Sequence, residues 1–192
     1  MTRLAIYGSG GMGRELRQAA RAWEGEIVFV SDAPDAQDRD CIGPDALTAD
    51  DRICIAIGDP AVRRRIADRI AGLAFATIVA PTALIDPEAS IGEGGMICDF
   101  AMVNSRARIG RHFLCNYYSH VSHDCVIGDF VTFSPRVSCC GTVTIGDGVF
   151  IGAGAVIRNG AGERPLTIGE GAFVGMGAVV TGDVPAGARI LP

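Results

Sequence analysis

Two adjacent side chains, His123 and Asp124, have the chemistry of a general base and its partner. Histidine exchanges protons near neutral pH, and a neighbouring carboxylate orients or polarises the imidazole. The chain has only three histidines, so few other side chains offer this chemistry. A polar pair that satisfies itself at a turn would have the same sequence, and both interpretations stay open at this point.

The pair lies within an internal repeat of six residues. From Ile85 to Ile157 every sixth residue is apolar, which gives thirteen consecutive matches. A second period of eighteen is superposed, because Ile-Gly-charged recurs at 91, 109, 127 and 145. Three repeats therefore make one coil of a hexapeptide β-helix, a triangle with flat sides. The next copy is delayed by five residues, to 168, which predicts an insertion between Arg158 and Thr167.

The repeat also predicts that His123 lies next to Gly141. Each lies two positions past an apolar core residue, Val121 or Cys139, and the two are one coil apart. We expect them at the same corner of the triangle, stacked about 4.8 Å apart as adjacent strands are. The N–H of Gly141 would then lie beside the His123 imidazole, where it could stabilise a developing oxyanion.

Residues 1–79 have the pattern of a small Rossmann-like domain. An apolar strand at 4–7 precedes a glycine loop and a helix, so the backbone can approach a ligand at a helix N-terminus that favours phosphate. Asp32 follows a second strand, where an acid often meets a ribose hydroxyl, and Asp59 can cap a second helix. A tight turn that binds nothing would look the same. The expected substrate-binding residues here are Gly8, Gly10, Gly11, Met12, Gly13, Asp32, Gly58 and Asp59.

This domain is too short for the two halves of a dinucleotide fold, which favours a mononucleotide group over NAD. Residues 80–82 form the expected hinge into the β-helix domain, 80–192. The second helix has an apolar stripe, and we expect Arg63, Arg64 and Arg65 on its solvated face. We also expect His112 to be solvated and His120 to be structural or to face an interface.

The composition excludes several classes of partner. The net charge of −5 over 192 residues argues against a nucleic-acid backbone as ligand. No apolar run reaches the roughly eighteen residues of a membrane-spanning helix, and the N-terminus lacks the pattern of a signal peptide. Seven cysteines, several at core positions of the repeat, fit free thiols in a reducing cytoplasm. The absence of Cys-x-x-Cys argues against structural zinc.

Several motifs together carry a resemblance that covers nearly the whole chain. They are Tyr7–Gly13, Ile55–Asp59 with Arg63 beyond, Ser122–Phe130, Cys140-Gly141 and Ile151–Gly154. With them the chain resembles the bacterial hexapeptide-repeat sugar O-/N-acyltransferase family. The resemblance implies an α/β Rossmann-like domain that holds a nucleotide-linked amino sugar, followed by an all-β left-handed parallel β-helix. It also implies a homotrimer, with acetyl-CoA lying along the β-helix between neighbouring subunits.

The resemblance further assigns roles to single residues. His123 matches the family's catalytic base, Asp124 its acidic neighbour, and Asn116 a position near the acceptor, although a corner asparagine that bonds its own turn would look the same. The residues expected at acetyl-CoA are Thr132, Gly141, Ala153, Gly154 and Arg158. Arg158 either reaches the coenzyme phosphates or belongs to a plain surface loop. No metal is expected.

This chain departs from its relatives at Met12, at Thr132 and at its C-terminal end. Many relatives have histidine where this chain has Met12 and Thr132, and the chain stops at Pro192, before a Gly-x-Pro-Ala tail that is common in relatives. We therefore expect altered nucleotide and coenzyme contacts at these places.

The activity implied is acetyl-CoA-dependent N-acetylation of a nucleotide-linked 4-amino-4,6-dideoxy sugar in the cytoplasm, for surface glycans. The alternatives are O-acetylation of a sugar, a non-catalytic trimeric β-helix protein, and a zinc site of the γ-carbonic anhydrase type. The spacing of the histidines argues against the zinc site. The nucleotide base, the configuration of the sugar and the pathway are not indicated.

Overall fold

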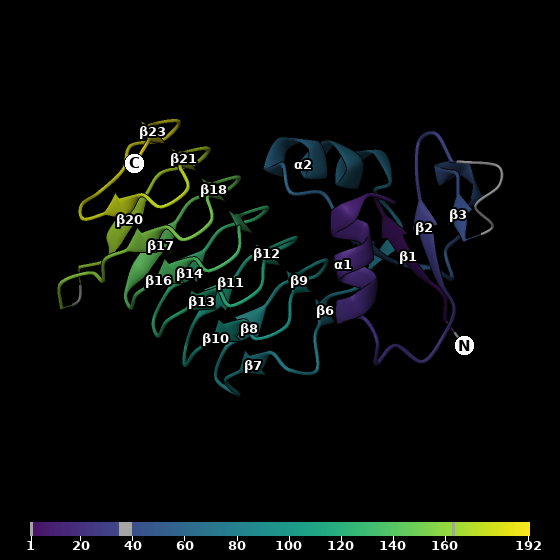
Figure 1. Ribbon diagram of the computed structural model, residues 1–192, viewed down its shortest axis with the longest axis horizontal. Coiled ribbons are helices and arrows are strands. Elements are labelled where there is room, and N and C mark those ends of the chain that lie inside the picture. Colours follow the sequence, from purple (N-terminus) through teal and green to yellow (C-terminus); the bar gives the residue numbers. More distant parts are fainter. Residues whose placement is uncertain (1, 35–39, 163) are drawn as a thin grey trace.

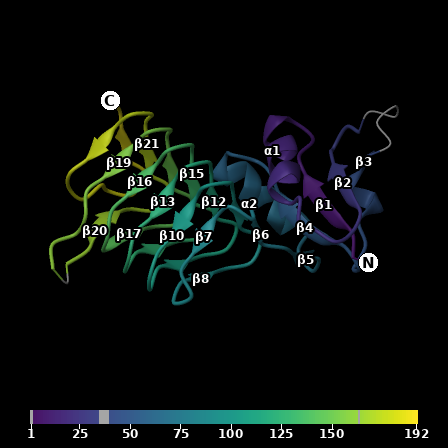
Figure 2. The same ribbon diagram turned by 60° about the horizontal axis from the view of Figure 1, so that its bottom comes forward.

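The computed structural model describes residues 2–34, 40–162 and 164–192, and it has two parts side by side along its long axis (Figures 1 and 2). A small α/β domain is followed by a coil of short parallel strands stacked in three sheets. The predicted fold class, a Rossmann-like domain followed by a left-handed parallel β-helix, is confirmed. The first strand of the β-helix, β6 (Ile78–Val79), pairs with β9 (Met96–Ile97).

The N-terminal domain is a five-stranded parallel sheet with a helix against each face. The strand order is β3-β2-β1-β4-β5. Alternate residues of β1 divide between two cores: Leu4 and Ile6 pack with α1, and Ala5 and Tyr7 pack with α2. The elements are β1 (Leu4–Tyr7), α1 (Gly11–Ala19), β2 (Ile27–Val30), β3 (Cys41–Ile42), the 3-10 helix η1 (Pro44–Ala46), β4 (Arg52–Ile55), α2 (Pro60–Arg69) and β5 (Ala74–Phe75).

The β-helix has three faces, numbered in the order in which the chain first meets them. Face 1 consists of β6 (Ile78–Val79), β9 (Met96–Ile97), β12 (Leu114–Cys115), β15 (Thr132–Phe133), β18 (Phe150–Ile151), β21 (Phe173–Val174) and β23 (Arg189–Ile190). Face 2 consists of β7 (Leu84–Ile85), β10 (Met102–Val103), β13 (His120–Val121), β16 (Ser138–Cys139), β19 (Val156–Ile157) and β22 (Val179–Val180). Face 3 consists of β8 (Ser90–Ile91), β11 (Arg108–Ile109), β14 (Val126–Ile127), β17 (Val143–Ile145) and β20 (Leu166–Ile168).

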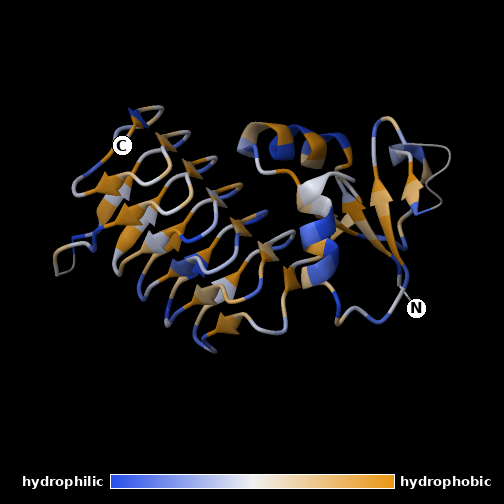
Figure 3. Ribbon diagram, in the orientation of Figure 1, coloured by the Kyte–Doolittle hydropathy of each residue, from blue (hydrophilic) through white to orange (hydrophobic). Residues whose placement is uncertain are grey.

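The pairing confirms the repeat that the sequence predicted. Val121 lies beside Val103 on one side and Cys139 on the other, each one coil away. Across the predicted insertion Ile145 pairs with Ile168, so the ladder resumes in phase after the extra residues. The strands of the coil are largely hydrophobic (Figure 3). Alternate residues of each strand point inward, and the inward residues form one buried cluster.

The turns between faces share one backbone feature. From Phe100 to Thr142 every sixth residue has a positive φ, between 55° and 61°, and none of these residues is glycine. From Gly148 onward the left-handed positions are held by glycines. This conformation lets each turn reverse within a few residues, and glycine adopts it without steric cost.

The N-terminal domain packs on face 1 and on the turns at its two edges. Leu16 of α1 belongs to the same buried cluster as Met96 and Leu114, and α2 shares a cluster with Phe130. Arg21 after α1 forms a 2.6 Å ion pair with Asp99 in the β-helix. The turns that join face 2 to face 3, here called the 2/3 corner, therefore lie on the side of the triangle away from this domain (Figure 2).

Candidate functional site

His123 and Asp124 lie at the 2/3 corner, in the turn between β13 and β14. The Nδ1 atom of His123 is 2.8 Å from Oδ2 of Asp124, and the imidazole is 63% exposed. Asp124 is one of the left-handed turn residues, with φ of 58°. If the carboxylate accepts from Nδ1–H, Nε2 is the nitrogen with a free lone pair, as a general base requires.

Arg106 completes this arrangement from the preceding coil. Its Nε and Nη2 atoms donate to the two carboxylate oxygens of Asp124, at 2.8 Å and 3.1 Å. The hydrogen bonds from Arg106, and then from His123, hold the pKa of Asp124 below its ordinary value. Our sequence analysis missed Arg106. The signal was the period of eighteen, which places residue 106 directly beside 124.

Gly141 lies against the imidazole, as the repeat predicted. A Cβ atom built on Gly141 would be 2.5 Å from Cε1 of His123 and 2.6 Å from Nε2, so a side chain there would displace the imidazole. The backbone stacks as expected, because Thr142 N–H donates to the carbonyl of His123 at 3.0 Å. Within the described residues the buried Gly141 N–H donates to no acceptor. With Nδ1 protonated, Nε2 has a free lone pair and lies close to Gly141, whose amide has no partner among the described residues, which suits attack on an acyl group.

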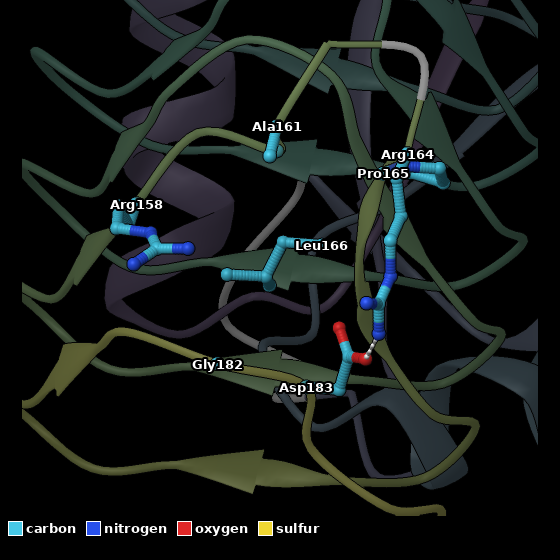
Figure 4. Close-up of a pocket in the computed structure, with 8 residues that line it drawn as sticks. Arg158, Ala161, Arg164, Pro165, Leu166, Gly182 and Asp183 are labelled. Carbon is cyan, nitrogen blue, oxygen red and sulfur yellow. Dashed lines mark hydrogen bonds and ion pairs between the residues drawn. The ribbon is translucent and has the colours of Figure 1, made fainter.

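The predicted insertion extends the same corner. Gly160 N–H donates to the Gly141 carbonyl at 3.0 Å, and the residues that follow border a cavity of about 200 Å³. The guanidinium of Arg158 points toward this cavity (Figure 4), while Arg164 pairs with Asp183 at 3.3 Å. Arg158 is therefore available to an anionic group bound beyond Gly141.

The glycine loops meet at the carboxyl edge of the N-terminal sheet, between the adjacent strands β1 and β4. Gly8 has φ of 115°, and a Cβ on Gly13 would lie 1.9 Å from the Gly8 carbonyl oxygen, so both positions require glycine. Gly10 and Gly11, at the start of α1, face open space. A Cβ atom built on Gly58 would lie 3.6 Å from Cε of Met12. This edge, where connections leave in opposite directions, is where open α/β sheets bind ligands.

The two acids predicted for this domain have protein partners. Asp59 caps α2 by accepting from the amides of Ala61 and Val62, at 2.8 Å and 3.0 Å. Asp32 accepts from the Tyr7 hydroxyl and from Arg69, both at 2.7 Å, and the hydrogen bond from Tyr7 contributes most to lowering its pKa. Its side chain remains 60% exposed.

The remaining predicted residues lie away from His123 of the same chain. Asn116 is buried in the turn from face 1 to face 2, here called the 1/2 corner, and its Oδ1 accepts from the next amide at 2.8 Å. Ala153 and Gly154 lie further along this corner, where Ala153 borders an apolar groove of about 800 Å³ with Phe150 and Phe173. Thr132 is buried on face 1 under the N-terminal domain, and its Oγ1 donates to the Gly58 carbonyl at 2.8 Å.

Two expectations about exposure are wrong. Arg63 is 1% exposed and His112 is 2% exposed, although both were expected to be solvated. Arg63 lies on the buried stripe of α2 with Ile66, Ala67 and Ile70, and this spacing was a signal that the sequence already contained. His112 is stacked on Phe130, with ring centroids 4.6 Å apart, because the N-terminal domain covers this turn.

His112 and His120 differ from His123 in their surroundings. Burial, with smaller effects from Arg63 and Arg111, lowers the pKa of His112 to about 4. Burial also lowers the pKa of His120, which lies on face 2. The residues that the structure describes contain no group of three His, Cys, Asp or Glu side chains placed to hold a metal ion. They also include no helix with the length and apolarity needed to cross a membrane.

Family comparisons match both parts of the chain. Residues 3–70 match the PglD N-terminal domain, and residues 124–159 match the bacterial transferase hexapeptide (six repeats). The GDP-perosamine N-acetyltransferase of Escherichia coli O157:H7 is 43% identical over 138 residues, which cover 71% of this chain and 62% of that protein. The match thus spans less than two thirds of this curated relative's length.

Solved structures match the whole chain. WeeI from Acinetobacter baumannii AYE is 35% identical with a TM-score of 0.92, and the match covers 100% of this chain and 97% of that one. The acetyltransferase domain of PglB from Neisseria gonorrhoeae FA1090, in complex with acetyl coenzyme A, is 30% identical with a TM-score of 0.90 over 100% and 96% of the two chains.

Proposed function

Because this chain belongs to the bacterial hexapeptide-repeat sugar acyltransferase family, we propose that it transfers an acetyl group from acetyl-CoA to the 4-amino group of a nucleotide-linked 4-amino-4,6-dideoxy sugar. The observation that carries the proposal is the packing of the His123 imidazole against Gly141, 18 positions further along the repeat, whose amide has no partner among the described residues. The acetylated position is inferred from the family and from relatives named as N-acetyltransferases of such sugars.

In the reaction, the amine nitrogen attacks the thioester carbonyl carbon and His123 accepts its proton at Nε2. The Gly141 N–H stabilises the oxyanion of the tetrahedral intermediate. The intermediate collapses with cleavage of the carbon–sulfur bond, and the proton held by His123 passes to the departing thiolate. Asp124, held by Arg106, keeps the imidazole oriented throughout. Arg158 is placed to meet a phosphate of the coenzyme.

We further propose that the active site lies between subunits of a homotrimer. The glycine loops rest on face 1, whereas His123 lies at the corner away from that face. One chain alone therefore separates the acceptor loops from the base, and a second copy must bring its own loops to this corner. The expected cofactor residues also divide between the 2/3 corner (Gly141, Arg158) and the 1/2 corner (Ala153, Gly154), as expected for acetyl-CoA held between two subunits.

The cytoplasm supplies both substrates, so we place the reaction there. Five cysteines are buried as thiols, which suits a reducing compartment. Surface glycan synthesis is the use that we propose for the product.

The test is an acetyl-transfer assay with purified protein, acetyl-CoA and UDP-, GDP- or dTDP-linked 4-amino-4,6-dideoxy sugars. Thiol release and product mass are the readouts, and turnover on one of the three supports the proposal and identifies the base. Turnover only on free sugars would replace it with O-acetylation. Nucleotide binding without transfer to any acceptor would instead indicate a non-catalytic protein.

A further inference from the structure

Arg63 is a buried cation whose guanidinium contacts no carboxylate among the described residues. Its Nε donates to the His112 carbonyl at 3.0 Å, and Nη1 donates to the carbonyls of Ile57 and Gly58. Nη2 donates to the carbonyls of Phe130 and Val131 and to Oγ1 of Thr132, at 2.8, 3.2 and 2.9 Å. Burial lowers its pKa to about 10, so it keeps its charge at neutral pH.

These contacts exclude a role for Arg63 in binding the phosphates of a substrate. A guanidinium has five N–H donors, and the contacts at Nε, Nη1 and Nη2 use them on oxygens of the protein. The oxygens come from both domains: two belong to the loop after β4, and the others belong to the β-helix. Arg63 therefore fixes the loop that follows β4 relative to the β-helix.

Thr132 supports the same loop from the β-helix side. Its hydroxyl accepts from Arg63 and donates to the Gly58 carbonyl at 2.8 Å. A Cβ atom built on Gly58 would lie 3.6 Å from Cε of Met12, so the Gly58 loop is adjacent to the first glycine loop. A chain of contacts thus runs from β15 through Gly58 to the loop at the N-terminus of α1.

We infer that Thr132 and Arg63 are positioning residues for the acceptor nucleotide: they hold the Gly58 loop, and through it the first glycine loop, at a fixed place on the β-helix. This inference rests on the proposed function for the identity of the ligand. It gives Thr132 a role at the acceptor loops instead of the contact with acetyl-CoA that the family resemblance implied. Losing one hydrogen bond of this kind should lower the population of the correctly placed loop relative to displaced loops about five- to ten-fold.

Thr132→Val tests the inference, because valine keeps the shape of the side chain and removes the hydroxyl. The matched controls are Thr132→Ser, which restores the hydroxyl, and Thr144→Val, the same change on face 3 away from the N-terminal domain. We expect the KM for the nucleotide sugar to rise about five- to ten-fold in Thr132→Val, with the KM for acetyl-CoA unchanged. Hydrogen exchange of the peptide spanning 56–62 should accelerate by a similar factor.

Thr132→Ser should restore both values, and Thr144→Val should change neither. A rise in the KM for acetyl-CoA alone, or equal exchange in the two valine variants, would overturn the inference. If the wild-type protein acetylates no sugar, the proposed function fails, but the exchange measurement still decides the positioning role. Arg63→Lys provides a second test, because an ammonium has three donors and cannot replace the five of the guanidinium, so exchange of the same peptide should accelerate.

Discussion

At the scale of single residues, the proposed acid–base apparatus consists of three side chains on two coils. Arg106 holds Asp124, and Asp124 holds His123. The left-handed conformation of Asp124 is one that aspartate tolerates better than most residues. Each member reaches the next because a parallel ladder stacks turn on turn, so the geometry depends on the repeat more than on the local sequence.

Replacing His123 tests the base directly. We expect His123→Ala and His123→Asn to lower kcat/KM by about 10²–10⁴-fold, because proton transfer in the transition state is lost. The oligomer and its melting temperature should stay unchanged, since the imidazole is largely exposed. His120→Asn, three residues earlier on strand β13, is the control. Equal losses of kcat/KM in His120→Asn and His123→Asn would contradict the assignment of His123 as the base.

Gly141→Ala tests the packing of the imidazole. The new Cβ would lie 2.5 Å from Cε1 of His123, so the ring must rotate away from the free amide. A displacement of about 1 Å can cost about 10² in rate, and we expect a loss of that order with normal folding. Gly43→Ala, which places the same methyl group in open space, should leave the rate unchanged. An active Gly141→Ala enzyme would contradict this geometry.

At the scale of elements, the β-helix could be predicted and the burial at its corners could not. A period of six fixes which residues point inward on every strand, so all thirteen apolar positions from Ile85 to Ile157 lie in strands. The neighbours of a turn residue depend on what packs outside the coil. His112 is buried because the N-terminal domain covers its turn, and no local pattern specifies that contact, whereas the burial of Arg63 could be read from the stripe of α2.

The left-handed turn positions make a prediction about stability. Gly148 has φ of 63° and open space around its Cβ site, so Gly148→Ala changes backbone energy without a clash. We expect it to lower the free energy of unfolding by about 1 kcal/mol, measured by urea denaturation. Gly43→Ala, at an ordinary φ of −77°, should be close to neutral. Equal stability of the two variants would show that this turn relaxes around the methyl group.

At the scale of the whole molecule, the junction between the domains should respond to acid. The pKa of His112 in the folded protein is about 4, below the value near 6.5 of an unfolded chain. The unfolded state therefore binds the proton first as pH falls. The contribution of His112 to the free energy of unfolding is fully present above about pH 6.5. It is lost progressively as the pH falls to about 4, and the total loss is on the order of 3 kcal/mol.

His112→Asn tests this origin of acid sensitivity. Asparagine does not titrate and tolerates the left-handed conformation of this position, where φ is 55°. The decrease in unfolding free energy between pH 7 and pH 5 should be smaller in the variant than in the wild type, whatever its absolute stability. The carboxylates contribute equally to both proteins, so identical decreases would rule out His112 as the source.

The separation of His123 from the glycine loops predicts complementation between inactive subunits. His123→Ala removes the base, and Gly11→Glu places a negative charge in open space at the loop, where it should repel a nucleotide diphosphate. Each variant alone should be inactive. The two variants are then co-expressed in equal amounts. A site between subunits is intact when one subunit supplies a normal loop and its neighbour supplies a normal histidine. Random assembly produces this combination at about a quarter of the sites. Turnover near that fraction of the wild-type rate supports a shared site. If instead one chain supplied both groups, no mixed oligomer would contain an intact site, and the co-expressed protein would be as inactive as either parent.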